Sequence, residues 1–415
     1  RAITRNLNSE ELLLLTFNNS MVKGKQLVNA EVIVPYKGFE LYDMEGRNIP
    51  YQIEKVEEIK ASSIGIWSSM GNFSSTVNKI KFSFYVDFPF NFGYLIHKIV
   101  KKENMAIEVQ DKDRISIDEK DHIIENKFFK IKIYENGTLD ILDKQSNKFY
   151  KDLNVIEDCG DEGDTYNYSP VKDDEVITSL SIDKGEMELL EKGPIKAVYK
   201  VKYDMKVPYK LDGNKRSEKK IDMPIETFIT IYSHIKRVDI RTIIYNKAYN
   251  HRVRALFGTG IRTDHSFAET QFGVIKRENK LDDSRWEIDK WSEKPLPIYY
   301  QQKFVDINDG NHGLAILNRG IPEYEVYERD ENIVAITLIR GIGDMGKKDL
   351  AIRPGRASGV EMKCPEAQCM GVNILEYSIV PHLGDIDAAK ISEEAFKYVY
   401  EPYSVQNILE IERIQ

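Results

Sequence analysis

Cysteine is scarce in this 415-residue chain, and long apolar runs and an excess of positive charge are missing. The three cysteines, Cys159, Cys364 and Cys369, are too few and too dispersed for a disulfide framework or a zinc ribbon, and they indicate a reducing, cytoplasmic location. No run of roughly eighteen apolar residues occurs, so the sequence predicts no membrane-spanning helix. The net charge of −8 and the scattered lysines argue against a nucleic-acid partner.

Familiar catalytic motifs are missing as well. None of the seven histidines stands in His-x-Asp, His-x-His or His-Glu-x-x-His spacing, so no metal site is expected from local motifs. Neither a nucleophile elbow nor a phosphate-binding loop occurs, and the sequence predicts no catalytic residue. The first residue is Arg1 and no signal-peptide pattern follows it, so we expect a piece of a longer protein.

Strand patterns fill most of the chain. Short runs rich in Tyr, Phe, Ile and Val alternate with turns, as in a mainly β protein with few helices. An Asn136-Gly137 turn predicts a hairpin between 123–134 and 138–143. A single helix is expected over 386–399, where apolar residues recur at spacings of three and four. Other expected strands are 12–18, 27–35, 50–57, 79–87, 93–100, 197–207, 224–232, 237–246, 251–259, 297–306, 313–318, 323–328 and 333–339.

The stretch from Asp158 to Pro170 concentrates possible ligand-binding groups. Its glycines favour a loop, and two tyrosines follow a group of carboxylates. Carboxylates accept hydrogen bonds from hydroxyls and tyrosine rings lie against sugar C–H faces, so this loop suits a polyhydroxylated ligand. A solvated acidic turn or a structural cation site explains the same residues equally well. The carboxylates are Asp158, Asp161, Glu162 and Asp164.

Several blocks resemble glycoside hydrolase family 38 α-mannosidases, in particular the bacterial branch with mannosylglycerate-type hydrolases. They include Glu125–Phe129 with Glu135–Leu139, the aromatic loop Gly163–Pro170, His251–Phe257, Leu317–Tyr324 and Ala335–Arg340. Their order and spacing cover nearly the whole chain. This resemblance implies the β-domains that follow a catalytic barrel: the end of a helical bundle or a linker at 1–11, a small antiparallel β-sandwich at 12–103, a large two-sheet, galactose mutarotase-like supersandwich at 104–385, and a short helix with the start of a terminal β segment at 386–415.

The resemblance also implies that the catalytic groups lie outside this chain. In this family, zinc and the attacking Asp belong to the barrel, and no match to those motifs occurs in this chain. The expected role is therefore the non-catalytic part of a retaining α-mannosidase, inactive alone, with the N-terminal barrel as partner and a mannose-containing oligosaccharide or small mannoside as substrate. Self-association into a homodimer stays open.

Four residues are predicted to contact the substrate. The resemblance aligns Tyr166 with a family tyrosine that touches the sugar and Arg340 with a family arginine near the pocket, while Tyr168 and Asp164 accompany Tyr166 in its loop. Each has a structural alternative: core packing for the tyrosines, capping of the loop backbone for Asp164, and neutralisation of a buried acid for Arg340.

Two other functions fit a β-sandwich of this kind. The first is that of a freestanding carbohydrate-binding module, and the second is that of a mutarotase-like epimerase. The epimerase needs a His and a Glu facing each other on a concave face, and no Asn-His-(Ser/Thr)-aromatic block supports it.

Overall fold

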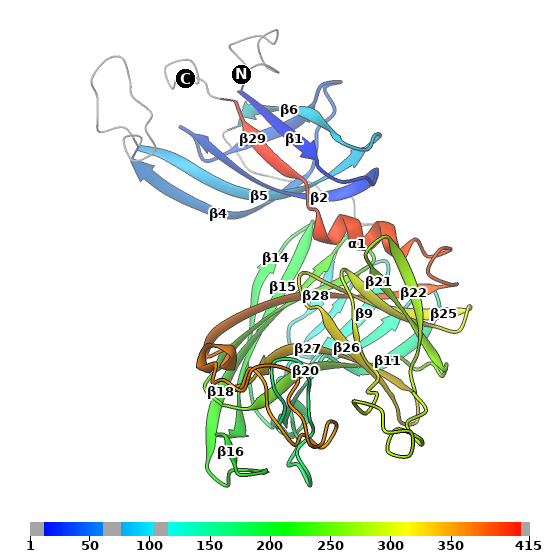
Figure 1. Ribbon diagram of the computed structural model, residues 1–415. Coiled ribbons are helices and arrows are strands. Elements are labelled where there is room, and N and C mark those ends of the chain that lie inside the picture. The colour runs from blue at the N-terminus through cyan, green and yellow to red at the C-terminus, as the bar shows by residue number, and fades with distance from the viewer. Residues whose placement is uncertain (1–11, 61–75, 103–114, 408–415) are drawn as a thin grey trace.

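The computed structural model describes residues 12–60, 76–102 and 115–407. They form a small sandwich, here called the first sandwich, and a larger β structure, here called the large region (Figure 1). Helix α1 (Ile391–Val399) lies where the two meet. The prediction of a mainly β chain with few helices is confirmed.

Two antiparallel sheets make the first sandwich, with strand orders β2-β5-β4 and β29-β1-β6-β3. Alternating residues of β5 (Thr76–Phe88) send Phe82 and Phe84 into an apolar core. The last strand, β29 (Tyr403–Gln406), pairs with β1 (Leu12–Asn18) and so joins the two ends of the described chain in one sheet. The remaining strands are β2 (Gly24–Val34), β3 (Phe39–Asp43), β4 (Tyr51–Lys60) and β6 (Gly93–Lys101).

The large region stacks a nine-stranded sheet against shorter sheets around one extended apolar core. The nine-stranded sheet has the order β14-β15-β18-β19-β28-β25-β24-β21-β22. Its strands are β14 (Glu186–Lys192), β15 (Lys196–Pro208), β18 (Lys220–Tyr232), β19 (Val238–Asn246), β28 (Gly371–Leu383), β25 (His312–Asn318), β24 (Phe304–Asn308), β21 (His265–Thr270) and β22 (Gly273–Glu278).

Three further sheets complete this region. The six-stranded sheet, which positions the candidate site, runs β13-β12-β20-β27-β26-β23, the five-stranded sheet runs β11-β10-β9-β8-β7, and β16 pairs with β17. Their bounds are β7 (Ser116–Asp118), β8 (Ile123–Glu125), β9 (Phe129–Ile133), β10 (Leu139–Asp143), β11 (Lys148–Leu153), β12 (Val155–Gly160), β13 (Ile177–Thr178), β16 (Leu211–Asp212), β17 (Lys215–Arg216), β20 (His251–Gly258), β23 (Ile298–Tyr300), β26 (Glu323–Glu328) and β27 (Asn332–Gly341).

Three predicted elements have other bounds in the structure. Asn126 accepts hydrogen bonds from the backbone N–H groups of Phe128 and Phe129, so the strand expected over 123–134 divides into β8 and β9. The strand expected over 297–306 divides into β23 and β24, which belong to different sheets. Helix α1 begins at Ile391 rather than at 386 because Lys390 adopts φ 54°, a left-handed conformation.

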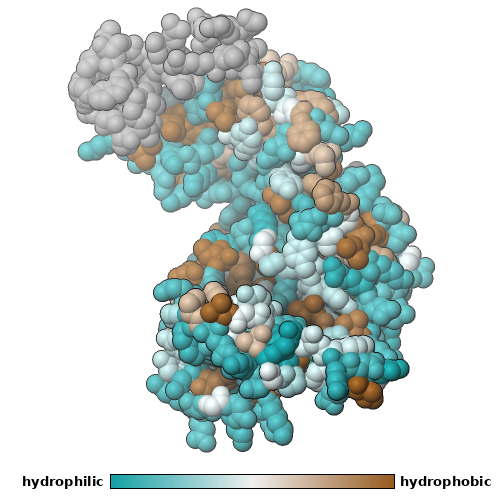
Figure 2. Space-filling view, in the orientation of Figure 1, coloured by the Kyte–Doolittle hydropathy of each residue, from teal (hydrophilic) through white to brown (hydrophobic). Residues whose placement is uncertain are grey.

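Polar contacts connect the two regions. The Oε1 atom of Gln52 in the first sandwich accepts hydrogen bonds from the N–H groups of Ile195 and Lys196, at 3.1 and 3.0 Å. Tyr85 donates its hydroxyl hydrogen to the Ile195 carbonyl at 2.9 Å. Figure 2 shows that the molecule narrows where the regions meet and that its visible face is largely hydrophilic.

Candidate functional site

The loop that follows β12 is held closed by its own backbone and by Asp161. Glu162 N–H donates to the Ser169 carbonyl at 2.9 Å, and Asp164 N–H donates to the Asn167 carbonyl at 3.1 Å. The Asp161 carboxylate accepts hydrogen bonds from Gly163 and Ser169 N–H groups at 2.8 and 3.2 Å. The glycine-rich, Asx-rich sequence therefore folds as a narrow loop, as its composition predicts.

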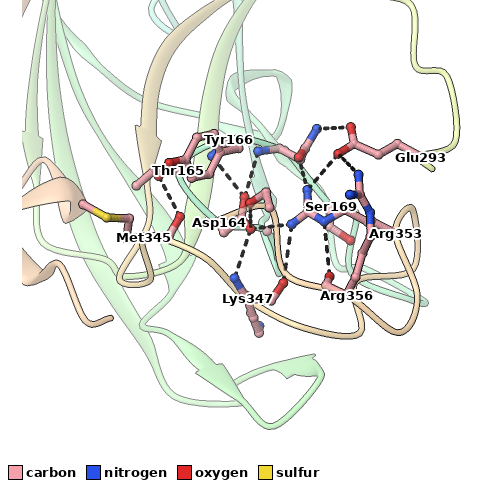
Figure 3. Close-up of polar contacts among 12 residues, drawn as sticks. Asp164, Thr165, Tyr166, Ser169, Glu293, Met345, Lys347, Arg353 and Arg356 are labelled. Carbon is pink, nitrogen blue, oxygen red and sulfur yellow. Dashed lines mark hydrogen bonds and ion pairs between the residues drawn. The ribbon is translucent and has the colours of Figure 1, made fainter. Parts of the chain in front are cut away.

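Asp164 lies at the centre of this loop and is fully buried (Figure 3). Its Oδ1 atom accepts the N–H groups of Tyr166 and Asn167, each at 3.0 Å. Its Oδ2 atom accepts hydrogen bonds from Lys347 N–H at 3.0 Å, from the Ser358 hydroxyl at 2.9 Å and from the Arg353 guanidinium. Burial raises the pKa of Asp164, but these hydrogen bonds outweigh it and hold the pKa below its ordinary value.

Asp164 therefore uses both oxygens to fix the protein. This geometry gives it the loop-capping role that was its structural alternative, and substrate contact by Asp164 stays a prediction.

Arg340 clamps the same loop from β27. Its Nε atom donates to Asp161 Oδ2 at 2.7 Å, and its Nη2 atom donates to the carbonyl oxygens of Asp164 and Asn167. Its side chain is largely buried and Asp161 is completely buried. The buried acid that Arg340 was expected to neutralise is thus Asp161, and a substrate contact by Arg340 stays a prediction.

Two further residues complete the loop network, a name used here for Asp161, Asp164, Arg340, Arg353 and Glu293. The fully buried Arg353 binds Asp164 through Nη2, and through Nη1 it binds Asn167 and Glu293 Oε1, the latter at 3.3 Å. Sequence reasoning missed both residues. Arg353 lies 189 positions from Asp164, so no local spacing signals the pair.

The two tyrosines of the loop are used differently. Tyr168 packs over Arg252, with the guanidinium carbon 3.5 Å from the ring centroid, and burial raises the pKa of Tyr168 far above its ordinary value. Tyr166 is 59% exposed. The network therefore presents one aromatic ring to the outside and anchors the other.

A cavity of about 500 Å³ opens beside these tyrosines and is called the aromatic cavity here. Its wall combines aromatic rings with carboxylates and one ammonium group. The rings come from Tyr166, Tyr168, Tyr299 and Tyr300, and the charged groups from Glu293, Glu323 and Lys294. Such a lining of flat apolar faces and a few polar groups is typical of a small-molecule site.

A second cavity of about 440 Å³ lies between the first sandwich, the large region and α1. Several of its basic side chains have acidic partners: Lys236 lies 3.1 Å from Asp143, and Lys397 lies 2.7 Å from Glu394. His382 Nε2 lies 2.6 Å from Asp306. Each pair lies within the large region or within α1, and the four tyrosine rings line the other cavity, so the aromatic cavity is the better candidate for a ligand.

Metal-binding groups do not converge in the described part of the chain. Within residues 12–60, 76–102 and 115–407, no three His, Cys, Asp or Glu side chains are grouped so as to hold a metal ion. No helix among these residues is long and apolar enough to cross a membrane.

The chain is similar to known proteins in both sequence and structure. The family model described as "Glycosyl hydrolases family 38 C-terminal domain" matches residues 124–344. A Halalkalibacterium halodurans protein named "Putative mannosylglycerate hydrolase" is 26% identical over 344 residues, covering 79% of this chain and 36% of that protein. "Alpha-mannosidase G" of Dictyostelium discoideum is 25% identical, covering 71% of this chain and 24% of that protein.

Solved structures share the fold over almost the entire chain. An alpha-mannosidase from Enterococcus faecalis V583 superposes with a TM-score of 0.80 at 24% identity, covering 97% of this chain and 46% of that one. A second Enterococcus faecalis protein, from glycosyl hydrolase family 38, gives a TM-score of 0.79 at 22% identity, covering 97% of this chain and 48% of that one. The chain thus spans about a third of its first curated relative and about half of these structures.

Proposed function

This chain belongs to glycosyl hydrolase family 38 through that family's C-terminal domain, and from this premise we propose that it is the non-catalytic part of a retaining α-mannosidase. The observation that carries the proposal is the exposed Tyr166, held by the loop network at the mouth of the aromatic cavity. A fixed aromatic ring supplies a contact surface for a sugar at little cost in conformational entropy.

The proposed partner is an N-terminal catalytic barrel of the same polypeptide. The relatives' greater length and their names support this proposal. In retaining hydrolysis one carboxylate attacks the anomeric carbon while a second carboxyl group protonates the leaving oxygen. Neither role is assigned to this chain, whose loop carboxylates are occupied by protein donors.

Zinc, which the family resemblance implies, does not fit the described residues of this chain, because their acidic and histidine side chains form no donor cluster. We infer that zinc belongs to the barrel. The three free cysteines support our inference of a reducing, cytoplasmic location.

Hydrolysis of an aryl α-mannoside tests the proposal. The purified 415-residue chain should be inactive with or without added zinc. In the enzyme that joins it to its barrel, Tyr166→Ala should lower kcat/KM roughly tenfold, the loss expected when a contact of about 1.4 kcal/mol in the transition state disappears. Tyr94→Ala, which removes an exposed tyrosine from the first sandwich, is the matched control. Turnover by the isolated chain, or equal kcat/KM for the Tyr166→Ala and control enzymes, would overturn the proposal.

A freestanding carbohydrate-binding module is the second candidate, favoured by the tyrosine rings and carboxylates that line the aromatic cavity. The same variants separate the two. If the chain is a freestanding module, Tyr166→Ala should weaken sugar binding by the 415-residue chain. No hydrolysis is then expected, with or without the substitution.

A further inference from the structure

The aromatic cavity has a built floor at the edge of the six-stranded sheet. In the antiparallel register of β23 and β26, Tyr300 lies directly opposite Glu323, so their side chains share one face of the sheet. Glu323 is fixed by the Thr337 hydroxyl, which donates to its Oε1 atom at 2.6 Å. Tyr300 is 39% exposed and accepts a hydrogen bond from Gln271 at 3.3 Å.

The opposite wall is the loop itself. Tyr166 and Tyr168 face the cavity from this side, together with Glu293, whose Oε2 atom accepts a hydrogen bond from Asn167 at 3.1 Å. A ligand between the walls meets aromatic rings and carboxylate oxygens. Pyranose rings offer the matching surfaces, because their C–H faces pack on aromatic rings and their hydroxyls donate to carboxylates.

The one cation in the lining and the two arginines beside Glu293 are engaged by protein carboxylates. Lys294, the one ammonium group in the lining, lies 2.8 Å from Asp283. Arg353 and Arg356 lie 3.3 and 3.4 Å from Glu293.

The buried Arg252 does not line the cavity, because the Tyr168 ring covers its guanidinium group, whose carbon lies 3.5 Å from the ring centroid. Arg252 lies 3.4 Å from Glu325 and 4.0 Å from Glu323. A carboxylate or phosphate on a ligand would therefore meet acceptors and find no uncommitted positive partner in the lining.

From these contacts we infer that the aromatic cavity is a binding site for a neutral pyranoside and discriminates against an acidic one. The assignment of mannose as that sugar rests on the proposed function, whereas the preference for a neutral ligand rests on the cavity. The preference then separates this chain from an enzyme that must accept a carboxylate beside its mannose, the chemistry named for the Halalkalibacterium relative.

A matched pair of ligands tests the inference on the 415-residue chain. Methyl α-mannoside and methyl α-mannuronoside differ by a carboxylate in place of the C6 hydroxymethyl group, and both can be titrated by ligand-observed NMR. Methyl α-mannoside should bind with a Kd on the order of millimolar, and the acidic analogue at least roughly fivefold more weakly at low salt. High salt should narrow the difference, because it screens the repulsion.

Three variants assign the effect to the cavity. Tyr300→Ala should weaken methyl α-mannoside binding, while Tyr94→Ala in the first sandwich should leave it unchanged. Glu323→Gln keeps the shape of the side chain and should reduce the discrimination between the two ligands. Equal binding of both ligands, absence of saturable binding, or discrimination that is undiminished in Glu323→Gln would overturn the inference.

These outcomes are independent of the hydrolysis test. Selective binding without any role in hydrolysis would leave the cavity assignment in place and remove the mannosidase proposal. A Tyr166→Ala effect on hydrolysis without ligand discrimination would do the reverse.

Discussion

The first sandwich and the loop network are stabilised in different ways. In the first sandwich, the rings of Phe39, Tyr51, Phe82 and Phe84 pack at centroid distances of 4.6 to 5.6 Å in an apolar core. In the loop network, buried charges neutralise one another. Apolar packing is non-directional and scales with buried area, whereas a buried ion pair fails as soon as one partner is lost. The structural part of this protein can thus tolerate change that the candidate site cannot.

The largest expected effect is the loss of Arg353. Arg353→Met leaves the Asp164 carboxylate buried without its ionic partner, and such a loss costs about 3–5 kcal/mol. Urea unfolding should show a lower midpoint, and hydrogen exchange should rise in 161–170. Arg356→Met is the matched control, because Arg356 also faces Glu293 but its side chain is 53% exposed, so its ion pair is worth less than about 1 kcal/mol. Equal losses of stability in the two variants would show that the buried ion pair between Arg353 and Asp164 does not stabilise the loop network.

The first sandwich also buries a titratable side chain, His97, and acid unfolding tests its effect on stability. His97 is buried in the core with its ring against Phe84, and desolvation lowers its pKa to about 4, although Asp43 opposes this shift. The unfolded chain, with a histidine pKa of about 6.5, binds this proton more readily than the folded chain. Stability is therefore complete above about pH 6.5 and falls as the pH approaches 4, by about 3 kcal/mol.

Thermal unfolding measured across this pH range checks the effect. His97→Leu should flatten the acid limb, whereas His312→Gln at the start of β25 in the large region should not change it. An acid limb that persists in His97→Leu would assign the loss to other groups.

Period-two alternation made the strands predictable from the sequence. The pattern of 79–87 sends Phe82 and Phe84 inwards, and the structure places both in the core as the main part of β5. The Asn136-Gly137 turn is equally local: Gly137 has φ 77°, a conformation that glycine adopts without strain.

Long-range partners could not be predicted in the same way. The loop Asp158–Pro170 was recognisable as a candidate site from its composition, but the partners of its carboxylates lie far along the chain, Arg340 at 179 positions from Asp161 and Arg353 at 189 from Asp164. Tyr299 and Tyr300 gave no signal either, because only the split of 297–306 into β23 and β24 turns β23 into the edge of the cavity. Strands and tight turns depend on residues that are close in the sequence, so they can be derived from one sequence. Contacts between loops that are distant in the sequence cannot.

The smallest expected effect comes from a substitution in the apolar core of the first sandwich. Phe82→Leu keeps an apolar side chain in the core of the first sandwich and should cost about 1 kcal/mol, since the neighbouring rings can close part of the space. No charge changes partner, so urea unfolding should give the same loss at low and high salt, and Arg353→Met provides the charged counterpart measured under the same conditions. The two sites share no contact network, so their effects should add in the double variant. A salt-dependent Phe82→Leu loss, or strong coupling to Arg353→Met, would show that the core of the first sandwich and the loop network form one cooperative unit and would end the distinction drawn between them.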